Sequence, residues 1–484
     1  MLMEAGLPAN PRLTRTLPAA KAGIVHFGPG AFFRAFGAIY TNDVMDPAKD
    51  KWGIVAVSLK SPTARDQLMP QGGTYTAIER GPDGEKTQKI NSIVNVLVAP
   101  EDPQAVLAQM ADPAIEIVSL TITEKGYCYA PATKRLDQTN ADIQHDISNL
   151  STPRTAIGFI VSALNQRRQA GQKPFTLLSC DNLPSNGQLL RNLTLEFAKL
   201  VDPTLAQWIS THATFPSTMV DRITPATTQA DIDRLAETES YVDLGCVVHE
   251  PFRQWVIEDN FVGARPNWEK AGAQIVANVD AHELMKLRCL NGTHSSLAYL
   301  GYLAGYELIS ETVADPSFSK LCHQMWQQEI TPTLPTPEGE DLPAYCQALM
   351  ERYENKAIKH RTWQIAMDGS QKLPQRLLGT VHDCLQMGRV PKGLSLAIAG
   401  WMRFVGGVDE KGQLIEVRDP MAEQLKHAYD AANDPAEKVL SLLAIHQIFE
   451  PQLTENQQFV SAVQAALSGL IHKGARQMVA ELTQ

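Results

Sequence analysis

Short apolar segments that alternate with helix-forming segments fill the first 180 residues, and this alternation constrains the fold more than any other feature. Residues 23–30 (GIVHFGPG) form an apolar run that ends in a glycine turn, and residues 31–45 are rich in helix formers and aromatic side chains. A second apolar run with β-branched residues follows at 52–59. Strand, helix and strand in this order predict a βαβ unit, whose two strands lie parallel in one sheet.

Two further apolar runs, at residues 116–123 and 175–180, are also flanked by helical patterns. This repetition predicts an α/β fold with a mostly parallel sheet covered on both faces. Residues 74–98 differ, because the turn sequence GPDG at 81–84 predicts two strands of an inserted hairpin. From about residue 281, helical periodicity continues to the C-terminus. We therefore expect two domains, 1–280 and 281–484, the second mainly α-helical.

Charge and cysteine usage narrow the class of protein. A formal net charge of −10 over 484 residues, with no run of basic residues, disfavours a nucleic-acid partner. The seven cysteines are dispersed without a Cys-x-x-Cys pair, which predicts reduced thiols. The chain starts without the basic patch and apolar core of a signal peptide, and no run of eighteen apolar residues follows. The sequence thus predicts a cytoplasmic protein that contacts no membrane.

The glycine turn after the first predicted strand suits the pyrophosphate of a dinucleotide. Gly28 and Gly30 let backbone N–H groups approach an anion at a helix N-terminus, although the same turn also occurs without a ligand. Phe33 stands where the third glycine of the fingerprint belongs. The second strand ends in Lys60 rather than in a carboxylate that would bind the adenosine ribose, so NAD and NADP both remain possible. The predicted cofactor-binding residues are Phe27, Gly28, Pro29, Gly30, Ala31, Phe32 and Lys60.

A predicted helix near residue 286 carries three polar residues suited to proton transfer. At about 100° per residue, Asn291 and His294 lie about 140° and 80° around from Lys286, so all three share one arc. A desolvated lysine acts as a base near neutral pH, whereas on a surface helix it is simply solvated. Glu283, one turn earlier, either relays a proton or forms an ordinary surface pair. Lys286 replaces the second histidine of a zinc motif that starts at His282, so we expect no metal.

Other polar positions are candidates for the same site. Asn182 follows a predicted buried strand and is a candidate oxyanion donor, although neighbouring Asp181 equally suits a turn. Arg253 lies in one cluster of polar and aromatic residues, and Arg361, Lys372 and Arg376 lie in another. An arginine binds a carboxylate in a bidentate fork, so these clusters either hold an acidic substrate or form structural salt bridges.

Together these segments resemble the polyol-specific long-chain dehydrogenase/reductase family, also called the mannitol dehydrogenase family. The similarity covers essentially the whole chain, and the spacing Lys286-x4-Asn291-x2-His294 is its most specific element. The family commonly has histidine at the positions of Phe33 and Phe36, and Pro29 stiffens the turn, so these departures affect the cofactor loop. The other matching segments are residues 26–34 (HFGPGAFFR), 121–127 (TITEKGY), 179–182 (SCDN), 219–223 (MVDRI) and 250–259 (EPFRQWVIED).

The resemblance implies a Rossmann-type N-terminal domain, a mainly helical C-terminal domain and metal-independent hydride transfer with NAD. It implies that Lys286 is the general acid/base, that Asn182 and Asn291 stabilise the oxyanion, and that His294 orients the substrate. It also implies that Asp221 contacts substrate hydroxyls, and that Glu124 and Glu283 serve the proton path.

Within the family, residues 363–376 (WQIAMDGSQKLPQR) are most similar to members that interconvert D-mannonate and D-fructuronate. Two alternatives remain open: a neutral polyol substrate such as mannitol or arabinitol, and a nicotinamide sensor without turnover. A monomer is compatible with the sequence.

Overall fold

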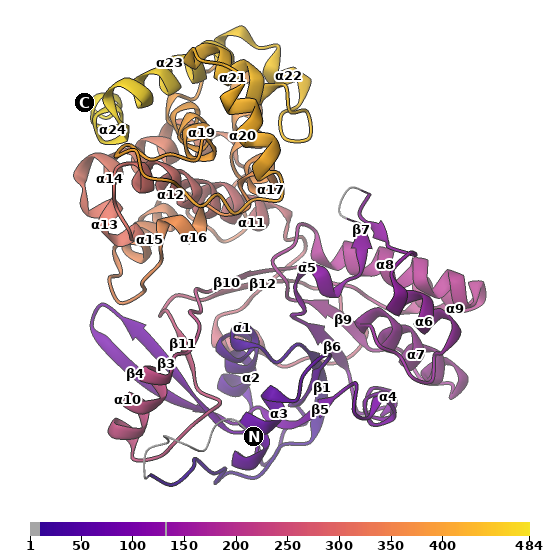
Figure 1. Ribbon diagram of the computed structural model, residues 1–484. Helices are drawn as coiled ribbons and strands as arrows, with labels where there is room; N and C mark the ends of the chain where they lie inside the picture. The colour runs from indigo at the N-terminus through magenta and orange to yellow at the C-terminus, as the bar shows by residue number, and fades with distance from the viewer. Residues whose placement is uncertain (1–9, 131–132) are drawn as a thin grey trace. The chain divides into compact units, whose positions relative to one another are not determined.

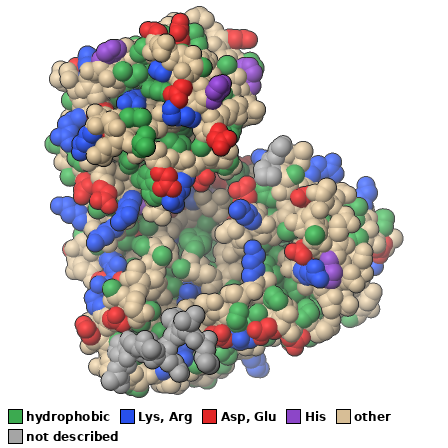
Figure 2. Space-filling model, viewed as in Figure 1, with side chains coloured by type: hydrophobic (Ala, Val, Ile, Leu, Met, Phe, Trp, Pro, Cys, Tyr) green, Lys and Arg blue, Asp and Glu red, His purple; other side chains and the backbone are tan. Residues whose placement is uncertain are grey.

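The computed structural model describes residues 10–130 and 133–484, so the chain start that bears on the signal-peptide prediction lies outside the described residues. The chain divides into two compact units, Met1–Asp280 (unit 1) and Ala281–Gln484 (unit 2). Figure 1 shows the elements of each unit. No helix of the described residues is both long and apolar enough to cross a membrane. Figure 2 shows Lys and Arg side chains interspersed with Asp and Glu on the visible face.

A five-stranded sheet in the order β5-β2-β1-β6-β9 forms the centre of unit 1 (Figure 1). All four pairings between neighbouring strands are parallel. This order corresponds to strands 3-2-1-4-5 of a doubly wound dinucleotide-binding sheet. The strands are β1 (Ala22–Phe27), β2 (Gly53–Ser58), β5 (Ile93–Val98), β6 (Ile117–Leu120) and β9 (Thr176–Ser179).

Alternate residues of these strands point into two different cores, because successive side chains of a strand face opposite sides. Val25 and Phe27 of β1 pack with Phe159 and the other helical residues of α4 and α7 on one face. Ile24 of the same strand packs with Phe36 of the opposite face. The predicted two-sided coverage is therefore confirmed. The helices of unit 1 are α1 (Ala31–Ala35), α2 (Gly37–Val44), α3 (Thr63–Leu68), α4 (Pro103–Ala111), α5 (Thr123–Gly126), α6 (Ala141–Ser148), α7 (Ala156–Gln169), α8 (Asn186–Val201), α9 (Pro203–His212) and α10 (Gln229–Glu239).

Two smaller three-stranded sheets flank the main sheet in unit 1. The predicted hairpin is present as β3 (Tyr75–Gly81) and β4 (Gly84–Ile90), which pair antiparallel and are extended by β11 (Val247–His249). The predicted insertion was too long, because β5 within it belongs to the main parallel sheet. The second small sheet has the order β10-β12-β13, formed by β10 (Thr218–Asp221), β12 (Gln254–Glu258) and β13 (Gln274–Val276). A short hairpin joins β7 (Tyr129–Ala130) to β8 (Arg135–Leu136).

The helix predicted over residues 31–45 is broken at Phe36. The φ and ψ of Phe36 are −134° and −92°, outside the helical region, so α1 ends there and α2 begins at Gly37. A Cβ at Gly37 would lie 3.1 Å from the Phe33 ring, which leaves room only for glycine at this bend without a shift of that ring. The bend lets the aromatic side chains of α1 and α2 pack on the sheet together.

All named elements of unit 2 are helical, as predicted (Figure 1). Helices α12 and α19 are almost wholly buried and pack on each other in its core. The α-helices are α11 (Asp280–Met285), α12 (Thr293–Leu303), α13 (Ile309–Ala314), α14 (Pro316–Gln324), α15 (Leu342–Glu354), α16 (Thr362–Ile365), α17 (Gly369–Leu373), α18 (Gly379–Gln386), α19 (Lys392–Val405), α20 (Ala422–Asp430), α21 (Pro435–Leu443), α22 (Pro451–Thr454), α23 (Gln457–Lys473) and α24 (Ala475–Leu482). Three segments are π-helical: Lys286–Gly292, Met325–Ile330 and Pro374–Leu378.

Candidate functional site

The glycine turn at the end of β1 has the geometry of a dinucleotide cradle. Gly28 has a φ of +92°, and a Cβ there would lie 2.1 Å from the Thr121 carbonyl oxygen, so only glycine fits. The Gly28 N–H donates to the carbonyl of Val57 at 3.0 Å, which ties the turn to β2. Gly30 is exposed, and a Cβ there would meet only the Gly28 carbonyl oxygen, at 4.0 Å. The chain therefore leaves open space at Gly30, where a pyrophosphate approaches the backbone in such folds.

Phe33 takes over the packing role of the missing third glycine. Its ring stacks on the His26 ring of β1, with centroids 3.3 Å apart and planes within 9°. His26 also bonds to the Ser119 and Thr121 hydroxyls at 2.8 and 2.9 Å. Burial lowers the pKa of His26 to about 3, so its ring is neutral at physiological pH. An aromatic stack thus replaces the close helix–strand contact that a glycine permits.

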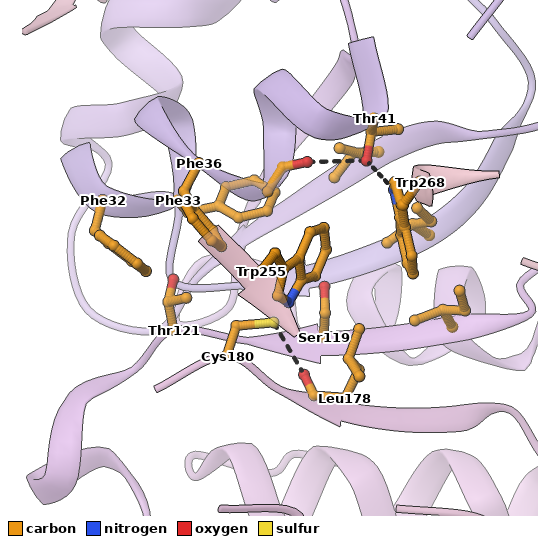
Figure 3. Close-up of a pocket in the computed structure, with 14 residues that line it drawn as sticks. Phe32, Phe33, Phe36, Thr41, Ser119, Thr121, Leu178, Cys180, Trp255 and Trp268 are labelled. Carbon is orange, nitrogen blue, oxygen red and sulfur yellow. Dashed lines mark hydrogen bonds between the residues drawn. The ribbon is translucent and has the colours of Figure 1, made fainter. Parts of the chain in front are cut away.

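A small cavity beneath α1 and α2 is not large enough for a nicotinamide ring (Figure 3). Its volume is about 10 Å³, and Phe33, Phe36, Trp255 and Trp268 are among the apolar side chains that line it. This volume corresponds to about one water molecule. The cavity is a packing defect of the core, and it contributes no candidate ligand site.

A larger groove of about 580 Å³ lies at the carboxyl ends of β2 and β5. Lys60 and Ala99 line it from the sheet, and Lys125, Asn140 and Arg154 line it from the loops and helices that follow. The adenosine half of a dinucleotide binds at this end of a doubly wound sheet. Lys60 lines this groove, and its contact with a cofactor stays a prediction.

The other predicted cofactor residues contribute mainly backbone. The Phe27 side chain is fully buried against Phe159, so its ring faces the core. Pro29 is buried, whereas Ala31 and Phe32 are half-buried at the start of α1.

Asn182 lies on the loop that follows β9, and Glu124 lies on the loop that follows β6, within its short helix α5; both residues are exposed. The Glu124 carboxylate accepts a hydrogen bond from the Tyr129 hydroxyl at 2.7 Å. Because β6 and β9 are neighbours, their carboxyl ends bring these two loops together at one edge of the sheet. Asp221, the last residue of β10, is buried opposite Gln254 of β12.

Lys286 begins a π-helical segment, so the prediction of a regular α-helix here is wrong. The i→i+5 pattern widens the turn, which brings Lys286 and Asn291 closer to one side than an α-helix would. Lys286 is 7% exposed, and Glu283 one turn earlier is half-buried. The half-buried Asn291 amide has no hydrogen-bond partner within residues 10–130 and 133–484. Single π-helical turns inside α-helices occur frequently at functional sites.

His294 stands at the centre of a cluster of polar residues in unit 2. Its ring stacks on the Tyr353 ring at 5.4 Å and meets the His360 ring edge-on at 4.6 Å. Burial, followed by the charges around it, lowers the pKa of His294 well below its ordinary value, so the imidazole is neutral. No hydrogen-bond partner for its ring nitrogens is found in the described part of the chain. One nitrogen is therefore left to donate and the other to accept.

Arg376 brings a buried positive charge to this cluster. It is held close because Gly292 has no side chain: a Cβ there would lie 2.8 Å from the Arg376 carbonyl oxygen. The guanidinium donates to the Ser295 hydroxyl at 3.0 Å. Among the described residues, no carboxylate lies within ion-pair distance of Arg376. Burial lowers its pKa below the ordinary value, yet an arginine stays charged at physiological pH.

The other three residues predicted to bind a carboxylate differ in their surroundings. The positive charge of Lys372 is one of those that lower the pKa of His294. Its ammonium donates hydrogen bonds to the Met367 and Ile365 carbonyls. Arg361 is 62% exposed and pairs with Glu307 at 3.5 Å. Arg253 in unit 1 pairs with Asp43 at 2.8 Å and covers the Tyr40 ring. Only Lys372 of the three joins the His294 cluster.

The sequence analysis gave Tyr353 and His360 no role, and it named Arg376 as one of several basic residues that favour an acidic substrate. Arg376 ends the segment 363–376 that the sequence singled out, and His360 lies just before it, so their residue types were a usable signal. Tyr353 carries no such signal, because it is one of two tyrosines on α15 and the sequence does not distinguish them. Over the described residues, no group of three or more His, Cys, Asp or Glu side chains is arranged to hold a metal ion.

Comparison with known proteins identifies the family. The mannitol dehydrogenase Rossmann domain matches residues 22–270, and the mannitol dehydrogenase C-terminal domain matches residues 278–471. The chain belongs to the mannitol dehydrogenase family. This result confirms the predicted family, the Rossmann-type N-terminal fold with a helical C-terminal part, and the class of oxidoreductases that act on CH–OH groups.

Relatives in this family differ in the substrate that their names give. D-mannonate oxidoreductase of Escherichia coli K12 is 47% identical over 95% of both chains. Mannitol 2-dehydrogenase of Pyricularia oryzae is 41% identical, over 94% of this chain and 91% of that one.

Solved structures of the family cover nearly the whole chain. Mannitol 2-dehydrogenase of Pseudomonas fluorescens, in a ternary complex with NAD and D-mannitol, has a TM-score of 0.83 at 38% identity, over 98% of this chain and 97% of that one. Substrate-free D-sorbitol dehydrogenase has a TM-score of 0.88 at 34% identity, over 98% of both chains.

Proposed function

We propose that the protein interconverts D-mannonate and D-fructuronate by hydride transfer with NAD, without a metal. The observation that supports an acidic substrate is the buried Arg376. It has no carboxylate partner in the described chain, and it lies near His294 together with Lys372. A buried charge without a counterion is costly, and a substrate carboxylate offsets that cost. The relative named for D-mannonate is also more similar in sequence than the relative named for mannitol, 47% against 41%.

The residues of unit 1 fit a bound dinucleotide. The space at Gly30 accepts the pyrophosphate, and the groove lined by Lys60 accepts the adenosine half. When bound, NADH supplies a hydride to the substrate carbonyl carbon, and NAD accepts it in the reverse direction.

In this proposal, side chains of the protein carry out the proton transfer of the reaction. In the reducing direction, the Lys286 ammonium gives its proton to the oxygen of the reacting carbonyl as that oxygen gains negative charge. Asn182 and Asn291 donate hydrogen bonds to this oxygen and stabilise the charge. Glu283 and Glu124 return a proton from solvent to Lys286.

In this proposal, His294 and Asp221 orient the substrate. The neutral His294 ring donates to one substrate hydroxyl and accepts from another, while Asp221 accepts from a further hydroxyl.

The decisive experiment compares kcat/KM for D-mannonate and D-mannitol, with NAD in excess and absorbance of NADH as the readout. The proposal expects D-mannonate to be preferred by at least about tenfold, since a charged hydrogen bond contributes about 1.5–3 kcal/mol. A preference for D-mannitol would replace the proposal with its alternative. Tight NAD binding with no turnover of either compound would favour a sensor.

The second candidate is a polyol dehydrogenase. The observation in its favour is the extent of similarity to the Pseudomonas fluorescens enzyme, whose complex holds D-mannitol. Under this alternative Arg376 binds hydroxyls through its N–H groups, and its replacement changes the rates on both substrates equally.

A further inference from the structure

Asp181 accepts three hydrogen bonds at the point where β6 and β9 end. One carboxylate oxygen accepts from the Ile122 N–H at 3.0 Å and from the Tyr127 hydroxyl at 2.8 Å. The other oxygen accepts from the Thr123 N–H at 2.9 Å. Asp181 is 8% exposed, and no step of the proposed reaction uses it. Its carboxylate therefore joins the loop after β9, to which it belongs, to the loop after β6.

The loop after β6 contains backbone conformations that are strained unless other contacts hold them. Thr123 has a φ of +62° and Cys128 a φ of +52°, both in the left-handed region that side chains with a Cβ rarely adopt. Each such residue costs about 1–3 kcal/mol unless its surroundings hold it. Two of the three donors to Asp181 are the backbone N–H groups at the start of this loop. Tyr127, near its end, also bonds to the Ser179 hydroxyl of β9 at 2.6 Å.

Each of the two joined loops carries one residue of the proposed reaction. Glu124 directly follows Thr123, and Asn182 directly follows Asp181. We propose that Asp181 is a positioning residue that holds Glu124 and Asn182 in a fixed relation at the carboxyl edge of the sheet. This inference rests on the proposed function, since it concerns the same reaction. Asp181 itself touches neither cofactor nor substrate in this proposal.

A carboxylate is required here because all three partners are donors. Asparagine has the same shape, but its NH₂ group would face a donor in place of one oxygen. A buried donor left without an acceptor costs about 1–3 kcal/mol, enough to release the strained turn at Thr123. Burial raises the pKa of Asp181 above its ordinary value, whereas hydrogen bonds from Ile122, Tyr127 and Thr123 lower it.

The test is Asp181→Asn, with Asp243→Asn as the matched control. Asp243 is also a buried carboxylate of unit 1 with three donors, Gln71, Thr76 and Gly245, and it joins no loop of the proposed site. Both variants should lose stability to a similar degree in thermal unfolding. At a temperature where both are folded, Asp181→Asn should lower kcat about ten- to a hundredfold, because a displacement of about 1 Å costs up to about a hundredfold. Its KM for the substrate should change less than threefold.

Two outcomes would overturn the inference: a kcat within twofold of wild type for folded Asp181→Asn, or an equal loss in Asp243→Asn. A mutant cycle that combines Asp181→Asn with Asn182→Ala and Glu124→Gln tests whether Asp181 acts through these two residues. If Asp181 acts through these residues, its replacement should lower kcat less than threefold further in the Asn182→Ala, Glu124→Gln background. A full additional loss there would refute that route. Failure of the proposed function is distinguishable, because it appears in the wild-type protein, which would then prefer D-mannitol or turn over neither substrate.

Discussion

Polar groups around the glycine turn of unit 1 bond to one another, whereas several around His294 in unit 2 do not. His26, Ser119 and Thr121 form a closed network beneath the turn. Asn291 and the His294 ring nitrogens have no partner in the described chain. The polar groups of unit 1 therefore fix the shape of the turn, whereas Asn291 and His294 of unit 2 keep hydrogen-bonding capacity that the proposed function assigns to the substrate. Substitutions in the two regions should therefore affect different quantities.

Lys286→Ala should have the largest effect. Loss of a general acid/base lowers kcat by about a hundred- to ten-thousandfold, while the affinity for NAD, measured by fluorescence titration, stays within threefold. Lys320→Ala, which removes an exposed lysine of α14, is the control and should keep wild-type kcat. Near-normal turnover in Lys286→Ala would remove the proposed proton donor.

Arg376→Met should come next and should separate acidic from neutral substrates. We expect kcat/KM for D-mannonate to fall about ten- to a hundredfold, because a charged hydrogen bond is lost, with a smaller change for D-mannitol. Arg361→Met, at an exposed arginine paired with Glu307, should change neither rate. The opposite ranking of the two arginines would mean that the His294 cluster is structural and that the original prediction for Arg361 holds.

Two glycine variants should distinguish the shape of the cradle from its use. Gly28→Ala places a Cβ 2.1 Å from the Thr121 carbonyl oxygen at a φ of +92°, so it should lower the melting temperature by several degrees. Gly30→Ala meets only the Gly28 carbonyl oxygen, 4.0 Å away, so stability should stay within about 0.5 kcal/mol of wild type while the Kd for NAD rises about tenfold. Equal Kd values for Gly30→Ala and wild type would place the pyrophosphate elsewhere.

The smallest effect should be a pH dependence of acid binding. Burial, followed by the nearby Arg376, lowers the pKa of Lys372 to about 8, so its positive charge is present below pH 8 and lost as the pH rises through that value. KM for D-mannonate should therefore rise several-fold between pH 7 and pH 9, while KM for D-mannitol changes less. Lys372→Met should abolish this difference. If KM for D-mannonate depended on pH in the same way in Lys372→Met and in wild type, a group other than Lys372 would be responsible.

Local patterns predicted most of the sheet and none of its irregularities. Four of the five parallel strands are visible in the sequence as apolar runs next to helical patterns. The fifth, β5, follows the hairpin without a helix between them, so its partner depends on long-range packing. The break at Phe36 was not predictable either, since residues 31–45 read as one helical run. A π-helical segment depends on tertiary packing rather than on residue type.

For the candidate site, residue types and their spacing predicted the candidates but not the shape of the turn between them. Lysine, asparagine and histidine were recognised by their types, and their placement on one helix is as expected, although the turn between them is wider. Arginine is ambiguous in sequence, because a salt bridge and a ligand contact require the same residue. Only the structure separates Arg361, which faces Glu307, from Arg376, which faces Ser295.

The π-helical segment Lys286–Gly292 also determines which side chains lie on one side of the helix. A π-helix turns by less per residue than the roughly 100° of an α-helix. If this stretch closed into a regular α-helix at the same length, Asn291 would move to about 140° around the axis from Lys286. The backbone hydrogen-bond pattern of seven consecutive residues thus sets the relative orientation of Lys286 and Asn291, in addition to their identities.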